Sequence, residues 1–143
     1  MIRPLRPDSM GYIRWLAGAA IKKGQICYLS SGEAKPTAEG VTTALILGVA
    51  VEDCADAATV KLYNPRQQFE IDIYQGSTVD TATDALLGTD YDIYVNGVAG
   101  DGSGEGDMSL DLNDETDPMF NLLGYDNVRR VAIVEFFEAL LYV

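Results

Sequence analysis

Runs of alternating apolar and polar residues constrain the fold of this 143-residue chain more than any other feature. In the segments 69–73, 91–95 and 108–112, apolar side chains occupy every second position. A period of two places one face of a strand in the core and the other in water. Asn96 and Gly97 follow the second segment, and an Asn–Gly pair between such runs is a strong signal of a β-hairpin. The pattern therefore predicts antiparallel β-structure.

Other short apolar runs predict further strands at 25–29, 45–51, 59–63, 120–125, 131–136 and 140–143. Turn residues recur between these runs, which is typical of a sandwich or a barrel. Only the segment 79–87 favours a short helix, with Asp80 or Thr81 as its cap. The chain is long enough to form one domain with its own core. We therefore expect an all-β fold with little helix, as a small β-sandwich or barrel-like domain.

Residues 1–15 are predicted to form an extended N-terminal arm, and residues 16–143 a single β-rich domain. Pro4 and Pro7 exclude a regular helix in the arm and favour extended backbone. The arm is either a frayed terminus or a segment that orders on a partner, and no strand of the predicted core lies in it. Its large apolar side chains favour the second alternative. The arm residues expected to contact a partner are Arg3, Leu5, Arg6, Ile13, Arg14 and Trp15.

Charge is distributed unevenly along the chain. The interval 67–128 holds 14 of the 22 acidic residues and no lysine or arginine, whereas the first 66 residues are slightly positive. An acidic middle repels nucleic acid and anionic membrane, because both depend on surface Lys and Arg for binding. No apolar run is long enough for a membrane-spanning helix. We therefore expect neither nucleic acid nor a membrane as a partner.

The sequence offers little for catalysis. It has no histidine, so it lacks the most common acid–base residue and metal ligand. Ser30 and Lys35 are close enough in sequence for a Ser–Lys pair, but a Ser-Ser-Gly-Glu turn explains them better. No glycine opens a phosphate-binding loop, and no nucleophile–base constellation is recognisable. We expect no catalytic residue, no cofactor and no metal site.

Residues 101–107 resemble a calcium loop at first sight. In an EF-hand that begins at Asp101, the twelfth position is Leu112, where a bidentate glutamate is required. A Gly-rich hairpin loop is therefore the favoured interpretation, with weak cation binding at 101–117 left open.

The two cysteines are expected to be reduced thiols. The apolar stretch 15–21 runs into Lys22 and Lys23, which does not fit a signal peptide. Without an export signal, Cys27 and Cys54 are expected not to form a disulfide. Cys27 lies in an apolar run, which predicts a core position.

The two halves of the chain show a weak internal similarity. Residues 24–29 resemble 88–95, residues 45–49 parallel 121–125, and residues 60–63 parallel 131–134. The order of the three matches agrees, but their spacings differ, whereas a regular repeat keeps its period. Two related β-units and coincidence are both open.

Residues 21–38 and 44–53 resemble the small capsid decoration (cement, or head-stabilising) proteins of tailed bacteriophages. Segments 87–95, 108–113 and 120–126 are similar to other phage head proteins of this kind. The resemblance covers most of residues 21–137 and is carried by structural glycines and apolar runs. It implies a β-rich domain of the β-tulip type, trimers on the outer capsid, and an N-terminal arm that lies on the shell. It implies no catalytic residue.

Together, these observations predict a non-enzymatic protein that binds the outer surface of a phage capsid and clamps neighbouring major capsid subunits. Its expected partners are the major capsid protein and two further copies of itself. It would be made in the host cytoplasm and located in the virion. The alternative is a β-sandwich adhesion module that binds carbohydrate or calcium through the 101–117 loop. An enzyme comes third.

Overall fold

Strands account for nearly all of the regular structure. The computed structural model describes residues 2–7, 10–38, 45–96 and 107–142. The strands are β1 Ile2–Pro4, β2 Tyr12–Leu16, β3 Ile26–Ser30, β4 Glu33–Pro36, β5 Ile46–Ala50, β6 Thr59–Tyr63, β7 Phe69–Asp72, β8 Asp90–Tyr91, β9 Ile93–Asn96, β10 Asp107–Leu110, β11 Phe120–Asp126 and β12 Val131–Phe136. Two single turns of 3₁₀ helix, η1 Asp84–Leu86 and η2 Glu138–Leu140, complete the described elements.

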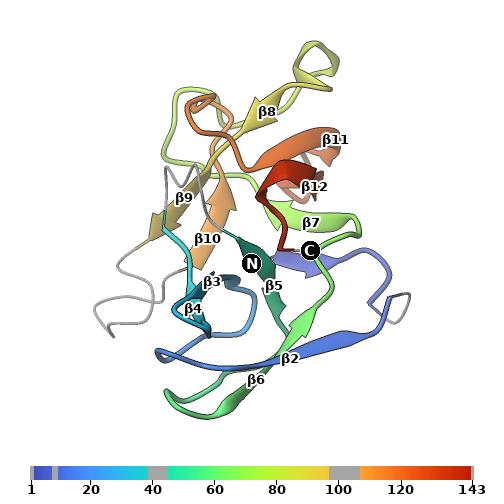
Figure 1. The fold of residues 1–143 in the computed structure, drawn as a ribbon. Coiled ribbons are helices and arrows are strands. Elements are labelled where there is room, and N and C mark those ends of the chain that lie inside the picture. Colours follow the sequence, from blue (N-terminus) through green and yellow to red (C-terminus); the bar gives the residue numbers. More distant parts are fainter. Residues whose placement is uncertain (1, 8–9, 39–44, 97–106, 143) are drawn as a thin grey trace.

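The strands form two antiparallel five-stranded sheets and one two-stranded ribbon. Sheet A has the order β1-β7-β12-β11-β8, sheet B has the order β2-β6-β5-β3-β4, and β9 pairs with β10. Figure 1 shows sheet A in the upper half of the molecule and sheet B in the lower half. The prediction of an all-β sandwich is confirmed.

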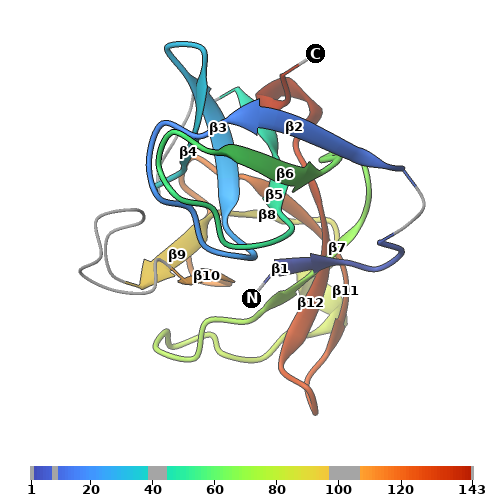
Figure 2. The same cartoon turned by 90° about the horizontal axis from the view of Figure 1, so that it is seen from below.

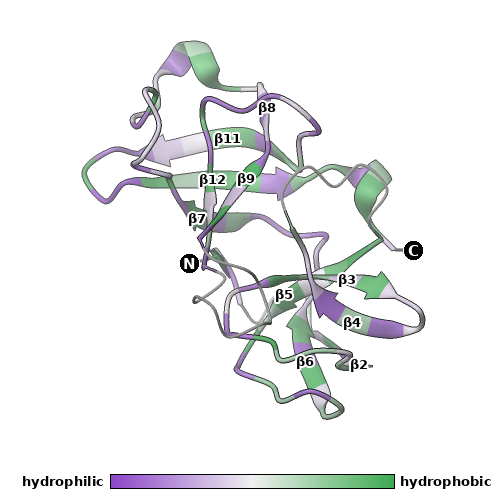
Figure 3. Cartoon of the chain, turned by 90° about the vertical axis from the view of Figure 1, so that its left-hand side faces the viewer, coloured by the Kyte–Doolittle hydropathy of each residue, from purple (hydrophilic) through white to green (hydrophobic). Residues whose placement is uncertain are grey.

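Two apolar clusters stabilise this arrangement. The larger cluster draws on both sheets and is built around Phe69, Phe120 and Ile46, which are fully buried. The smaller cluster lies on the other face of sheet B and contains Leu47 and Leu62. Figure 3 shows the apolar colouring of β3, β5 and β6 in this sheet. Sheet B is therefore apolar on both faces, which explains why β5 is a continuous apolar run rather than an alternating one.

Three of the predicted elements differ from the structure. The run 91–95 divides into β8 and β9 at Asp92, whose N–H donates to the Asp114 carbonyl outside the sheet. The predicted helix at 79–87 is only the single turn η1. The predicted strand at 140–143 is replaced by η2 and one isolated bridge between Leu141 and Ile46. The predicted hairpin loop after Asn96, residues 97–106, lies outside the described residues, but β9 and β10 are paired as expected.

The N-terminal segment is extended, as predicted, but it is part of the β-domain. β1 pairs with β7 at the edge of sheet A, and Ile2 is only 2% exposed in the larger cluster. β2 pairs along its whole length with β6 in sheet B. The prediction that residues 1–15 contain no strand of the core is therefore wrong. The two prolines do not prevent this pairing, because proline is tolerated in edge strands.

Both sheets repeat one strand order. Residues 12–63 form a first unit with the sheet order β2-β6-β5-β3, and residues 69–136 form a second unit with the order β7-β12-β11-β8. In each unit the first strand of the chain lies beside the last. In the first unit β3 continues into a hairpin with β4, and in the second unit β8 is followed by β9, which pairs with β10.

Backbone hydrogen bonds coincide between the two units. Gly24 and Gly88 precede equivalent strands with almost the same positive φ, 82° and 80°. The Gly24 N–H donates to the Ala50 carbonyl at 2.9 Å, and the Gly88 N–H donates to the Leu122 carbonyl at 2.8 Å. The pairing of Ala50 with Leu62 on the next strand matches that of Leu122 with Val134. The units therefore share both topology and register.

Each unit also closes on itself in the same way, which gives it a barrel-like shape. Ala17, just after β2, forms a parallel bridge with Ala34 of β4. Ile73, just after β7, forms the equivalent parallel bridge with Leu110 of β10. In both cases the next residue of the chain donates its N–H to that same bridge partner at 2.9 Å. The structure thus favours two related β-units over coincidence.

The sequence similarity did not identify the equivalent residues in β5 and β11. It aligned Gly48 with Gly124, because both follow apolar residues. In the structure Gly48 lies opposite Cys27, whereas the equivalent position opposite Tyr91 is Phe120. Equivalence is therefore determined by strand pairing and not by the glycines of the strands.

Candidate functional site

The expected partner-binding residues fall into two groups on different sheets. Arg3, Leu5 and Arg6 lie on or after β1 beside sheet A, whereas Ile13, Arg14 and Trp15 lie on β2 in sheet B. Figure 2 shows β1 and β2, in dark blue and blue, as well-separated strands. The structure therefore does not bring the six residues together into one surface.

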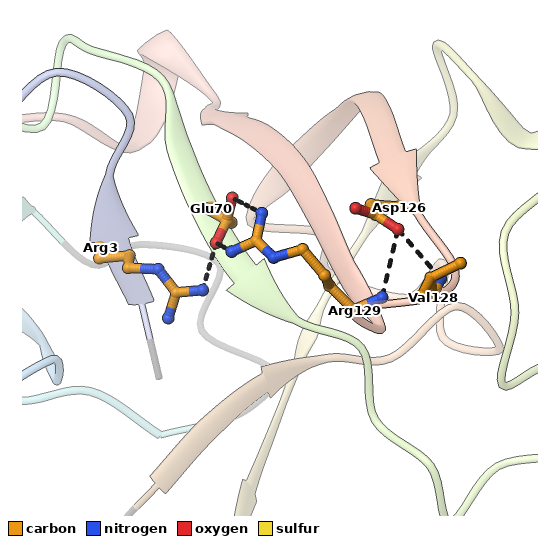
Figure 4. Close-up of polar contacts among 5 residues, drawn as sticks. All are labelled: Arg3, Glu70, Asp126, Val128 and Arg129. Carbon is orange, nitrogen blue, oxygen red and sulfur yellow. Dashed lines mark hydrogen bonds and ion pairs between the residues drawn. The ribbon is translucent and has the colours of Figure 1, made fainter.

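Arg3 belongs to an ion-pair cluster in sheet A that joins β1, β7 and the turn between β11 and β12. Its guanidinium and that of Arg129 both contact the Glu70 carboxylate, as Figure 4 shows. Arg129 binds Glu70 with two hydrogen bonds, Nη2 to Oε1 at 2.7 Å and Nη1 to Oε2 at 3.1 Å. Asp126 holds the turn before Arg129 by accepting the N–H groups of Val128 and Arg129.

The electrostatics of this cluster are those of a structural clamp. Burial acts to raise the pKa of Glu70, whose side chain is only 11% exposed. Hydrogen bonds from Arg129 and Arg3 outweigh burial, so the pKa of Glu70 is lowered from its usual value. Arg3 therefore has a carboxylate partner within the chain, and its contact with a partner protein stays a prediction.

Leu5 and Arg6 lie beside a small hollow. The Leu5 N–H donates to the Gln68 carbonyl at 3.1 Å, which extends the β1–β7 pairing by one residue. Leu5, Arg6, Gln67 and Gln68 line a hollow of about 380 Å³. The Leu5 side chain remains 39% exposed, so it is available for an apolar contact.

β2 presents two different faces. Ile13 and Trp15 point to the smaller cluster of sheet B and are half-buried against it. Tyr12, Arg14 and Leu16 alternate with them and are exposed. This exposed face is mixed, because two large apolar side chains flank one positive charge.

Two neighbours of β2 were not identified from the sequence, one beside Tyr12 of the exposed face and one beside Trp15 of the other face. The Lys61 ammonium lies 3.9 Å from the centre of the Tyr12 ring, in cation–π geometry. Tyr142, near the C-terminus, packs edge-on against Trp15 with ring centroids 5.7 Å apart. The alternation of residues 12–16 fits a strand, but these residues were predicted to belong mainly to the arm and no strand was assigned to them. The neighbours themselves come from distant parts of the chain, so no local pattern indicates them.

A groove larger than the hollow beside Leu5 lies elsewhere, between the end of β12 and the turn before β7. It has a volume of about 710 Å³ and is lined by Pro65, Arg66, Gln67, Gln68, Asp90, Asn121, Glu135, Phe136, Phe137, Glu138 and Leu141. Arg66 and Glu138 form an ion pair across it at 3.4 Å. The lining residues include no hydroxyl or thiol nucleophile beside a base, so the groove does not present a recognisable catalytic pair.

The cysteines are free thiols. Cys27 is fully buried in the smaller cluster, as its apolar run predicted. Burial, with a smaller contribution from nearby Cys54, raises the pKa of Cys27 to about 12. Burial, followed by the charge of Glu52, also raises the pKa of Cys54. Neither thiol has the lowered pKa that marks a reactive cysteine.

The 101–117 loop, where weak cation binding was left open, lies only partly within the described residues. Residues 101–106 lie outside the described residues, and Asp107 begins β10. In the described parts of the chain, no group of three acidic or cysteine side chains is arranged to hold a metal ion. The described parts also contain no helix that is long and apolar enough to cross a membrane.

Comparison with known proteins adds no family assignment. No protein-family model matches the chain, and a search among curated proteins also returns no match.

Proposed function

We propose that the protein is a non-enzymatic capsid decoration protein that binds the outer surface of a phage head and clamps neighbouring major capsid subunits. The proposal rests on the resemblance of residues 21–137 to this class. One structural observation supports it: the N-terminal segment carries large exposed apolar side chains at Leu5, Met10, Tyr12 and Leu16, of which Tyr12 and Leu16 share the outward face of β2. Exposed apolar side chains that share a face are a feature of interaction surfaces.

The positive charge of the same segment favours a partner with an acidic surface. Arg6 and Arg14 are exposed among these apolar residues, in a protein whose net charge is −12. A surface with apolar and basic side chains is complementary to a protein surface with apolar and acidic side chains. The acidic remainder of the chain opposes binding to nucleic acid or an anionic membrane.

Decoration stabilises a capsid through mass action. A protein that binds the assembled lattice better than the free subunits shifts the equilibrium towards the assembled state. Each copy needs only moderate affinity, because many copies bind one head. The proposed location is accordingly the outer surface of the virion.

We also propose that the protein acts as a homotrimer at local three-fold positions of the capsid. Closed cyclic symmetry is the usual form of a homo-oligomer. Multi-angle light scattering of the free protein, and mass measurement of decorated heads, test this part. A monomer in both states contradicts the trimer without affecting the binding itself.

The binding experiment uses expanded phage heads that lack decoration protein. The intact chain should co-sediment with the heads and raise the temperature at which they release DNA or fall apart. Leu16→Ser should weaken binding at least threefold, because it removes an exposed apolar contact. Leu87→Ser is the matched control, since Leu87 is an exposed leucine on the second unit, at 40% against 48% for Leu16. Failure of the intact protein to bind heads would contradict the proposed function.

A further inference from the structure

The outer edges of β2 and β7 are equivalent positions in the two units, but in the part of the chain that the structure describes only the outer edge of β7 is paired with another strand. β2 begins the first unit and β7 begins the second, and each pairs on its inner side with the last strand of its unit. On its outer side β7 is covered by β1. Within the described residues β2 is the edge of sheet B, and no strand pairs with the outer side of Ile13–Trp15. The first unit therefore lacks the strand that completes the second.

The β1–β7 pairing shows that this edge geometry accepts a short strand. β1 pairs antiparallel with β7, with Ile2 opposite Ile71 and Pro4 opposite Phe69. By the shared register, Trp15 and Ile13 occupy the positions of Ile71 and Phe69. The parallel bridges that close the two units lie beyond these positions, so they leave the edge free in both units. A strand of three residues therefore fits along Ile13–Trp15.

The charge at the centre of the edge is reversed between the units. In the second unit Arg3 of β1 lies opposite Glu70 and pairs with it. In the first unit Arg14 occupies the position of Glu70, and no ion-pair partner of Arg14 is found among the described residues. Lys61 lies directly opposite Arg14 on β6, and like charges in such a pair are destabilising. A carboxylate at the position equivalent to Arg3 would neutralise this pair.

We infer that β2 accepts an extended segment of a partner protein, which pairs antiparallel with Ile13–Trp15 and carries an acidic residue between two apolar ones. The acidic residue faces Arg14, and the apolar residues cover the half-buried side chains of Ile13 and Trp15. Backbone hydrogen bonds supply part of the affinity and the alternating side chains supply the specificity, as in other cases of strand addition.

A second copy of this chain is a poor occupant of the same edge. Antiparallel self-pairing of β2 about its centre places Arg14 opposite the Arg14 of the other copy. Exchange of β1 between copies places Arg3 opposite Arg14. Both arrangements bring like charges together on neighbouring strands. The inference rests on the proposed function only for the identity of the partner. If the protein binds a phage capsid, the segment is a loop or terminus of the major capsid subunit.

The test uses the intact, ¹⁵N-labelled protein and a synthetic peptide that contains Thr-Ile-Glu-Val-Thr. An NMR titration should shift the amide signals of residues 12–16 and saturate at millimolar peptide. A peptide with Arg in place of Glu should bind at least threefold more weakly. In the variant Arg14→Glu this preference should reverse, so that the Arg peptide binds better. Lys22→Glu, which changes an exposed residue of the same unit by the same charge, should keep the original preference.

Three outcomes of the titration would overturn the inference: no shift in β2 with either peptide, binding that does not depend on the charge at residue 14, or shifts confined to another edge. Protection of the β2 amides that rises with protein concentration, without peptide, would assign the edge to a second copy and also overturn it. The titration needs no capsid. If the protein binds the peptide but not phage heads, the inference about the β2 edge stands and the proposed function is contradicted. If it binds phage heads but not the peptide, the proposed function stands and the inference about the β2 edge is contradicted.

Discussion

The first and second units share a backbone hydrogen-bond pattern but carry different side chains at equivalent positions. At one equivalent pair of positions the first unit has Ile26 opposite Val49, and both are fully buried in the larger cluster. The second unit has Asp90 opposite Asn121, and these half-exposed side chains hydrogen-bond to each other at 2.7 Å. The two units thus keep the same register and topology although the side chains at this equivalent pair of positions differ. The side chains determine instead whether a sheet is covered on one face or on both.

The same comparison separates the two functions of the N-terminal segment. β1 completes the second unit, where Arg3 joins Arg129 on the buried Glu70 carboxylate. β2 begins the first unit and leaves Arg14 and Leu16 exposed at an uncompleted edge. One short stretch of chain therefore completes one sheet and forms the edge of the other, with no strand paired on its outer side among the described residues.

Removal of residues 1–16 should have the largest effect on the molecule. It deletes an edge strand from each sheet, together with the buried Ile2 and the strand that pairs with β6 on one side. We expect loss of the cooperative unfolding transition, measured by urea titration with tyrosine fluorescence and circular dichroism. A truncated protein with a normal transition would show that both units fold without their edge strands.

Gly48→Ala should break the first unit selectively. A Cβ at Gly48 would lie 2.2 Å from the Tyr63 carbonyl oxygen, and the residue has a φ of 154°. Because the backbone must move to relieve this contact, we expect a loss of at least about 3 kcal/mol in the free energy of unfolding. Gly124→Ala in the second unit is the control, since its nearest contact is an ordinary 3.4 Å to Ile133. Its cost should remain below about 1 kcal/mol, and equal losses would contradict this account.

Ile2→Ala and Ile13→Ala compare the covered edge with the uncovered one. Ile2 is almost fully buried, so its truncation should cost about 2–4 kcal/mol. Ile13 is only half-buried at the edge of the smaller cluster, and its truncation should cost roughly half as much. Urea denaturation measures both values. A larger loss for Ile13→Ala would indicate that β2 is the better-packed strand.

The strands of the core could be predicted from the sequence, whereas the completion of the sheets could not. Alternating or continuous apolar runs indicated β6, β7 and β12 with nearly correct bounds. β1 and β4 are short and contain Pro4 and Pro36, so they give no apolar signal above that of a loop. Asp92 interrupts a run that appears continuous, because its backbone bonds to a distant loop.

The assignment of the six arm residues to a partner-binding site stays a prediction, but the structure shows how they are distributed. They were selected from the sequence because large apolar and basic residues are interleaved in the arm. The intramolecular pairing of Arg3 depends on Glu70, which is distant in the sequence and is brought close only by the β1–β7 register. Long-range register is not encoded in any local pattern, which is why the two groups of residues could not be distinguished.

The pH dependence of stability should differ between the two charged positions. Because the pKa of Glu70 is lowered in the folded state, its ion pairs stabilise the fold above the ordinary glutamate pKa of about 4.3, and this stabilisation is lost as the pH falls through the lowered value. Glu70→Gln should therefore cost about 1 kcal/mol at pH 7 and progressively less towards pH 3. Arg14→Gln should show no such acid-dependent difference. Parallel pH curves for the two variants would contradict the assignment of Glu70 as the clamp of the second unit.

Amide hydrogen exchange of the free protein, followed residue by residue by NMR, tests the central comparison most directly. β7 lies between β1 and β12, so its amides on both sides should be protected. β2 pairs only with β6 within the described residues, so every second amide of 12–16 should exchange close to the unprotected rate. This pattern is the predicted result. Uniform protection along β2, or rapid exchange of alternate amides in β7, would contradict the account that one equivalent edge is complete and the other open.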